Sequence, residues 1–188
     1  PPHAPTEWNP VGSYRHEFEV PAKWDGRDVF ITFDGVQSAF YLWVNGEKVG
    51  YSQGSRTPAE FNISKYIKPG RNILAAEVYR WCDGSYLEDQ DFWRLSGIYR
   101  DVYLWSTAKS HIRDFTIVTE MDTLYKDATL KVKTDVINPS GTIEVELFNP
   151  DGSSIGKTNS KSMPSTNLQI PVTAPSNWKA EVLVLFTF

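Results

Sequence analysis

The chain of 188 residues has a globular composition: 40% of its residues are hydrophobic, 14% aromatic and 22% charged. Its formal net charge of −4 argues against a nucleic-acid-binding protein, which needs a basic surface to neutralise phosphates. No apolar run is long enough to span a bilayer, so no membrane association is expected. The single cysteine, Cys82, excludes an intrachain disulfide and a cysteine-based zinc site.

The first hundred residues predict an all-β domain, because their apolar residues alternate with a period of two. Asn45-Gly46 indicates a tight hairpin, since both residues tolerate a positive φ. Segment 61–67 is the exception and predicts one helical turn capped by Asn62. The simplest architecture is a two-sheet sandwich of jelly-roll type. The strands are expected at 13–20, 29–33, 39–44, 48–51, 73–80 and 98–105.

Segment 106–110 is small and polar and is interpreted as a linker, after which aromatic residues become sparser. Short strands separated by Asn-Pro turns then predict an immunoglobulin-like sandwich. Such a fold has about seven strands, so we expect its last strand to be missing here. The expected strands are 112–119, 128–136, 142–148, 168–172 and 181–188, with one short edge strand within 153–166 and turns at 138–141 and 149–152.

Residues 81–101, called here the acidic-aromatic loop, join two predicted strands and combine carboxylates with aromatic rings. Carboxylates accept hydrogen bonds from sugar hydroxyls or bind hard cations, and aromatic faces provide stacking surface. Loops fixed at both ends by a sheet commonly carry binding sites. One interpretation is therefore a sugar site with a cation; the other is a solvated acidic turn beside ordinary core aromatics. The residues concerned are Asp83, Glu88, Asp89 and Asp91 with Trp81, Tyr86, Phe92, Trp93 and Tyr99.

Residues 83–101 read DGSYLEDQDFWRLSGIYRD. Together with segments 9–14, 33–40, 43–46 and 50–52, they resemble the N-terminal region of glycoside hydrolase family 2 β-galactosidases. The resemblance runs from about Pro1 to Trp105 and is weaker from Ser110 onward. It implies a jelly-roll domain at 1–108 with its first strand missing and an immunoglobulin-like domain at 109–188. In this family a (β/α)8 barrel follows them.

The resemblance implies a retaining enzyme that hydrolyses terminal β-D-galactosides with two glutamates carried by the barrel. Neither glutamate motif occurs in these residues, so no catalytic residue is assigned and the chain alone is expected to be inactive. In the full-length enzyme the expected partner is a β-galactoside, and the protein is expected to be a homo-oligomer.

Two residues are candidates for the sugar site. The resemblance implies that Asp91 contacts the galactose and helps to hold a sodium ion shared with the barrel, two tasks that suit a carboxylate. Gln37 stands where the family often has an asparagine that touches the sugar, and its amide keeps the same chemistry with one more methylene. Magnesium is compatible with the full-length enzyme, and no metal is expected on this chain alone.

The neighbours of Asp91 are expected to be structural. Glu88 and Asp89 would shape the loop through ion pairs with Arg94 or Arg100. The rings of Tyr86 and Trp93 would pack to fix the loop.

Two alternatives stay open. A free-standing carbohydrate-binding module would use Trp43, Tyr51, Trp81 or Trp93 as its platform, and a purely structural pair of sandwiches from a cell-surface protein would have no ligand. No signal peptide is recognised in this sequence, which leaves a cytoplasmic or periplasmic location open.

Overall fold

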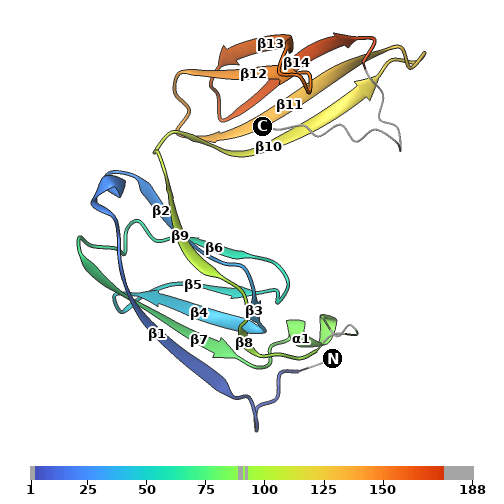
Figure 1. Ribbon diagram of the computed structural model, residues 1–188. Helices are drawn as coiled ribbons and strands as arrows, with labels where there is room; N and C mark the ends of the chain where they lie inside the picture. Colours follow the sequence, from blue (N-terminus) through green and yellow to red (C-terminus); the bar gives the residue numbers. More distant parts are fainter. Residues whose placement is uncertain (1–2, 89–90, 92, 176–188) are drawn as a thin grey trace. The chain divides into compact units, whose positions relative to one another are not determined.

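The computed structural model describes residues 3–88, 91 and 93–175. Its secondary structure is almost entirely β (Figure 1), as the sequence predicts. The chain divides into two compact units, Pro1–Ala108 and Lys109–Phe188, and the division falls inside the segment interpreted as a linker. The expected strand at 181–188 lies outside the described residues.

The first unit is a jelly-roll-type sandwich of two antiparallel sheets (Figure 1). Their strand orders are β1-β7-β4-β5 and β6-β2-β9. A third, short pair consists of β3 (Val36–Gln37) and β8 (Gly97–Ile98). The other elements are β1 (Val11–Glu19), the 3-10 turn η1 (Ala22–Trp24), β2 (Asp28–Phe33), β4 (Ala39–Val44), β5 (Glu47–Gln53), β6 (Ala59–Asn62), β7 (Arg71–Tyr79), α1 (Gly84–Leu87) and β9 (Val102–Thr107).

The core of this unit lies between the two sheets because alternate residues of β2, β4 and β7 point inward. Leu42 and Val44 are fully buried, and the rings of Phe33 and Phe40 lie 4.8 Å apart across the sandwich. Burial of this apolar surface is the main stabilising contribution to the unit and makes it a firm support for the acidic-aromatic loop.

The predicted hairpin is confirmed: Asn45 and Gly46 have φ values of 54° and 87° between β4 and β5. Asn45 also hydrogen-bonds to Asn72, which is fully buried. The Asn72 side chain binds Asn45 Nδ2 at 2.8 Å and the Lys68 N–H, the Lys68 carbonyl and the Gly70 carbonyl at 2.9 Å each. One buried amide thereby joins two turns at the edge of the sandwich.

Two local predictions were wrong in their extent. Segment 61–67 does not begin as a helix, because Phe61 pairs with Ile31 in the sheet and Asn62 ends β6. The predicted cap is present, since Asn62 Oδ1 accepts a hydrogen bond from Ser64 N at 3.0 Å, and Tyr66 N donates to Ile63 O at 2.9 Å in the turn that follows. The strand expected at 98–105 is interrupted between β8 and β9, and the loop contains the single helical turn α1.

The second unit is an immunoglobulin-like sandwich with two antiparallel sheets, β10-β11-β14 and β12-β13. Its core includes Val136, Ile143 and Leu168. The expected short edge strand is longer than predicted, since β13 has eight residues. The elements are β10 (His111–Met121), β11 (Asp127–Ile137), β12 (Thr142–Phe148), β13 (Ser154–Lys161) and β14 (Ser165–Thr173).

Candidate functional site

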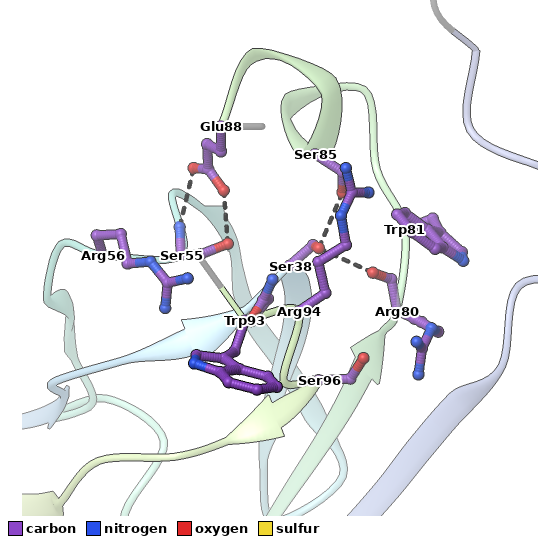
Figure 2. Close-up of a pocket in the computed structure, with 11 residues that line it drawn as sticks. Ser38, Ser55, Arg56, Arg80, Trp81, Ser85, Glu88, Trp93, Arg94 and Ser96 are labelled. Carbon is purple, nitrogen blue, oxygen red and sulfur yellow. Dashed lines mark hydrogen bonds between the residues drawn. The ribbon is translucent and has the colours of Figure 1, made fainter. Parts of the chain in front are cut away.

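The acidic-aromatic loop lines a small pocket together with β3, the end of β7 and the turn after β5 (Figure 2). The volume that the centre of a water-sized sphere can occupy in it is about 20 Å³. This space admits about one water molecule and excludes a sugar ring. The residues around the pocket are Gln37, Ser38, Ser55, Arg56, Arg80, Trp81, Ser85, Glu88, Trp93, Arg94 and Ser96.

The start of the loop is held by buried polar contacts. The Asn9 side chain accepts a hydrogen bond from Trp81 N at 2.9 Å and donates one to Trp81 O at 3.0 Å. Ser85 Oγ donates to Ser38 Oγ at 2.8 Å, and Ser38 Oγ donates to Arg80 O at the same distance. Ser38 and Ser85 are both buried, so these bonds are shielded from competing water.

Glu88 ends the helical turn and fastens it to the neighbouring strand connection. Its Oε1 accepts a hydrogen bond from Ser55 N at 2.9 Å, and its Oε2 accepts one from Ser55 Oγ at 2.5 Å (Figure 2). Ser55 is 1% exposed, and its carbonyl accepts a hydrogen bond from the Tyr99 hydroxyl. Instead of the expected ion pair with Arg94 or Arg100, the Glu88 carboxylate has a backbone amide and a hydroxyl as partners.

The two candidate sugar ligands have different surroundings. Gln37 is half-buried, lies opposite Gly97 in the β3–β8 pair and borders the pocket. Its Oε1 is buried and has no hydrogen-bond partner among the described residues. Asp91 is exposed and follows Glu88 by three positions. The described lining of the pocket includes Gln37 and not Asp91. A buried amide oxygen of this kind needs a donor from water or a ligand.

Arginine and tryptophan side chains form the other wall of the pocket. The Arg80 guanidinium carbon lies 5.4 Å from the ring centre of Trp8 and 5.6 Å from that of Trp81. The Arg94 guanidinium carbon lies 5.2 Å from the same Trp81 ring. Arg56 also lines the pocket. These cation–π contacts place positive charge at the start of the acidic-aromatic loop and stabilise Trp81 in its position.

The expected packing role is wrong for Trp93 and holds only in part for Tyr86. Trp93 is 85% exposed, so its ring does not pack against the loop, whereas Tyr86 is 39% exposed and most of its surface is covered. An exposed tryptophan beside a polar pocket instead offers a free stacking surface.

A second group of aromatic side chains lies on the β1-β7-β4-β5 sheet, on the face away from the core, and is called here the Tyr41 cluster. The Tyr41 ring centre lies 4.8 Å from that of Tyr51 and 6.0 Å from those of Trp43 and Tyr79. Partial burial raises the pKa of Tyr51 and that of Tyr79. Sequence reasoning named Trp43 and Tyr51 but missed Tyr41 and Tyr79, although the spacing of Tyr41 and Trp43 by two places them on one face.

Sequence reasoning also missed the three serines that anchor the loop, Ser38, Ser55 and Ser85. No motif signals them, because their importance comes from burial and from partners distant in sequence.

The exposed Asp91 carboxylate is a suitable donor for a hard cation such as sodium. Within the part of the chain that the structure describes, however, no three His, Cys, Asp or Glu residues gather as metal ligands. A cation at Asp91 would therefore need ligands other than a cluster of such side chains among the described residues. No helix of the described residues is long and apolar enough to cross a membrane.

Comparisons with known proteins agree on one family. The model of the family described as "Glycosyl hydrolases family 2, sugar binding domain" matches residues 1–108. A β-galactosidase of Priestia megaterium is 44% identical over 199 aligned residues, covering 100% of this chain and 19% of that protein. One of Vibrio cholerae is 48% identical, covering 84% of this chain and 16% of that protein. This chain thus spans about a fifth of its curated relatives.

Among solved structures, a β-glucuronidase of Bacteroides uniformis superposes with a TM-score of 0.77 over 91% of this chain and 23% of its own. The sequence identity is 24%, so this similarity concerns the fold alone. This chain and that β-glucuronidase therefore share an all-β fold.

Proposed function

The chain belongs to glycosyl hydrolase family 2, and on that premise we propose that it is the N-terminal, non-catalytic part of a retaining β-galactosidase. The observation that carries this proposal is the identity of 44% to a β-galactosidase over the whole chain. The catalytic glutamates would belong to a barrel outside these residues, and the reaction would release terminal β-D-galactose with retention.

We propose that this chain supplies one wall of the sugar site. The buried Gln37 Oε1 has no partner among the described residues and would accept a hydrogen bond from a sugar hydroxyl. The Asp91 carboxylate would accept another and contribute to a sodium site completed by other parts of the enzyme. Ligand pockets normally enclose most of their ligand, and the pocket of about 20 Å³ is too small to do so.

Two measurements test this proposal. In the full-length protein, Asp91→Asn should raise the KM for a chromogenic β-galactoside and the sodium concentration needed for half-maximal activity. Glu47→Ala, at an exposed position on β5, serves as the control and should leave both values unchanged. Wild-type kinetics in Asp91→Asn would contradict the assignment of Asp91.

The second measurement uses the chain of 188 residues by itself. It should neither hydrolyse the galactoside nor release heat when titrated with galactose or lactose in sodium buffer, with folding verified by circular dichroism. Hydrolysis would contradict the assignment of catalysis to the barrel. Full-length oligomerisation and magnesium binding stay predictions of the family resemblance.

A second candidate function is sugar binding by the chain itself, for which the Tyr41 cluster is the specific observation. Tyr51 is 44% exposed and its hydroxyl donates to Gln53 Oε1 at 2.7 Å, a combination of ring face and polar groups that suits a pyranose. Calorimetric binding of lactose that Trp43→Ala abolishes would favour this function over the first.

A further inference from the structure

We infer that Gln37 and Arg80 together form a binding site for one hydroxyl oxygen, which accepts a hydrogen bond from Arg80 Nε and donates one to Gln37 Oε1. The oxygen belongs to a water molecule or to a hydroxyl group of the sugar. The second of these sources rests on the proposed function, and the first does not. In both cases Arg80 gains a role in binding beside its contacts with Trp8 and Trp81.

Two polar atoms of this region are buried without a hydrogen-bond partner among the described residues, and they are complementary. Gln37 Oε1 is an acceptor, and Arg80 Nε carries a hydrogen that it can donate. Both residues line the same pocket, yet no hydrogen bond joins these two atoms directly. Buried polar groups are nearly always satisfied by protein or by ordered water, so both atoms need a further partner.

The contacts of Ser38 bring the two residues together. Ser38 N donates to Tyr79 O at 3.0 Å, and Ser38 Oγ donates to Arg80 O at 2.8 Å (Figure 2). Gln37 directly precedes Ser38, and Arg80 directly follows Tyr79, so both residues lie beside this double contact. Ser38 is 2% exposed, which shields the contact from water.

The size of the pocket fits a single oxygen atom with its hydrogens. The volume of about 20 Å³ is close to the smallest space that holds one water molecule, which needs two to four polar partners. A sugar hydroxyl is about as large as a water molecule, so it can enter where the ring cannot. Gln37 and Arg80 supply two partners for either group.

The chemistry of the two atoms selects a hydroxyl group or water as the ligand. An O–H group accepts a hydrogen bond through a lone pair and donates one through its hydrogen. A chloride ion or a carboxylate would accept from Arg80 but has no hydrogen for Gln37, and an ammonium group has the opposite defect. Among the described residues that line the pocket, Glu88 is the only carboxylate, and Ser55 already binds both of its oxygens.

The Arg80 side chain is held in position by aromatic rings. Its guanidinium carbon lies 5.4 Å from the ring centre of Trp8 and 5.6 Å from that of Trp81. The rings attract the positive charge but provide no oxygen acceptor for Nε. Because the side chain is already restrained, little of its freedom is lost when the oxygen binds, which favours binding.

A crystal structure of the chain of 188 residues tests the site directly. Because water fills such a site when no sugar is present, one ordered water is expected within about 2.7–3.2 Å of both Gln37 Oε1 and Arg80 Nε. Gln37→Met keeps the length of the side chain without its oxygen and should lose this water. The control Gln53→Met, at an exposed position on β5, should keep it.

Three results of that experiment would overturn the inference. The first is a direct hydrogen bond from Arg80 Nε to Gln37 Oε1. The second is the lack of any oxygen between these atoms. The third is a chloride ion held by Arg80 Nε and by the Gln37 amide nitrogen, because the site would then bind anions.

Steady-state kinetics of the full-length protein distinguish the two sources of the oxygen. The substrates are a chromogenic β-galactoside and analogues of it that each lack one hydroxyl group. Arg80→Lys keeps the charge and removes Nε. If the sugar supplies the oxygen, Arg80→Lys should raise the KM for the complete substrate about tenfold, as expected for one lost hydrogen bond of a charged group. It should then have no further effect on the analogue that lacks the bound hydroxyl.

An equal change in KM for all substrates, or no change for any, would assign the oxygen to water. The control Arg15→Lys, at an exposed position on β1, should leave KM unchanged. If Arg80→Lys does not fold, Gln37→Met carries the same comparison.

The two experiments separate failure of this inference from failure of the proposed function. The crystal structure requires no activity, so an oxygen that bridges the two side chains supports the inference even if the full-length protein does not hydrolyse galactosides. Lack of that oxygen in a protein that hydrolyses galactosides and is impaired by Asp91→Asn would overturn the inference alone.

Discussion

Asn72 offers the sharpest test of how the first unit is stabilised. It is a fully buried polar residue whose amide makes four hydrogen bonds, to Asn45, to Gly70 and to both backbone groups of Lys68. Asn72→Ala removes all four and leaves buried donors and acceptors without partners. With a net value of about 1 kcal/mol for each bond, the free energy of unfolding should fall by about 3–5 kcal/mol.

The measurement is urea unfolding followed by tryptophan fluorescence, which reports on the first unit because every tryptophan except Trp178 belongs to it. Asn62→Ala is the matched control: this asparagine is exposed, and among the described residues its side chain hydrogen-bonds to Ser64 alone, so its loss should cost about 1 kcal/mol or less. Equal losses for the two alanine variants would refute the reasoning.

Asn72→Asp adds a second, isosteric test. The aspartate would place an oxygen where Asn72 Nδ2 donates to Lys68 O and Gly70 O. The carbonyl oxygens of Lys68 and Gly70 would then face a carboxylate oxygen in a buried site without a hydrogen between them. An ionised carboxylate there carries an additional cost of desolvation. Asn72→Asp should therefore destabilise at least as much as Asn72→Ala. A milder effect would show that the polarity of the amide is not what the site requires.

Three further outcomes are expected. Leu42→Ala, at a fully buried position, should lower the free energy of unfolding by about 2–5 kcal/mol, measured against exposed Leu87→Ala. Burial raises the pKa of Tyr51 and that of Tyr79, so the unfolded state loses these protons first and the free energy of unfolding should fall as the pH rises above about 10. Urea titrations at pH 9 and 11 measure this fall, which should disappear when both tyrosines are replaced by phenylalanine. Gly97→Ala should destabilise the first unit by about 1–3 kcal/mol. Gly97 has a φ of 103°, and an added Cβ would lie 2.8 Å from the Tyr14 hydroxyl oxygen. An unchanged urea midpoint would contradict this.

The regular part of the fold could be predicted because its signals are local. Alternation of apolar residues marked β2 and β4, and Asn45-Gly46 marked the hairpin between β4 and β5. The error at 61–67 has a tertiary cause: Phe61 pairs with Ile31, so Phe61 and Asn62 belong to β6 and the turn capped by Asn62 is confined to the residues after it.

The candidate site could be predicted only in outline. The sequence indicates that residues 81–101 carry carboxylates and aromatics, and it cannot indicate where each side chain points. The partner of Glu88 is Ser55, 33 positions earlier, and the exposure of Trp93 depends on the path of the loop. Such contacts arise from tertiary packing and leave no pattern along the chain.

The strand pair β3–β8 has a consequence for how this protein can be altered. By placing Gln37 opposite Gly97, it holds the downstream end of the acidic-aromatic loop against β3. Loop closure depends only weakly on length, with each doubling adding about 0.6 kcal/mol. Segments of different length could therefore be inserted between these ends, provided that they keep Ser85 and Glu88, whose hydrogen bonds to Ser38 and Ser55 fasten the loop to the sandwich.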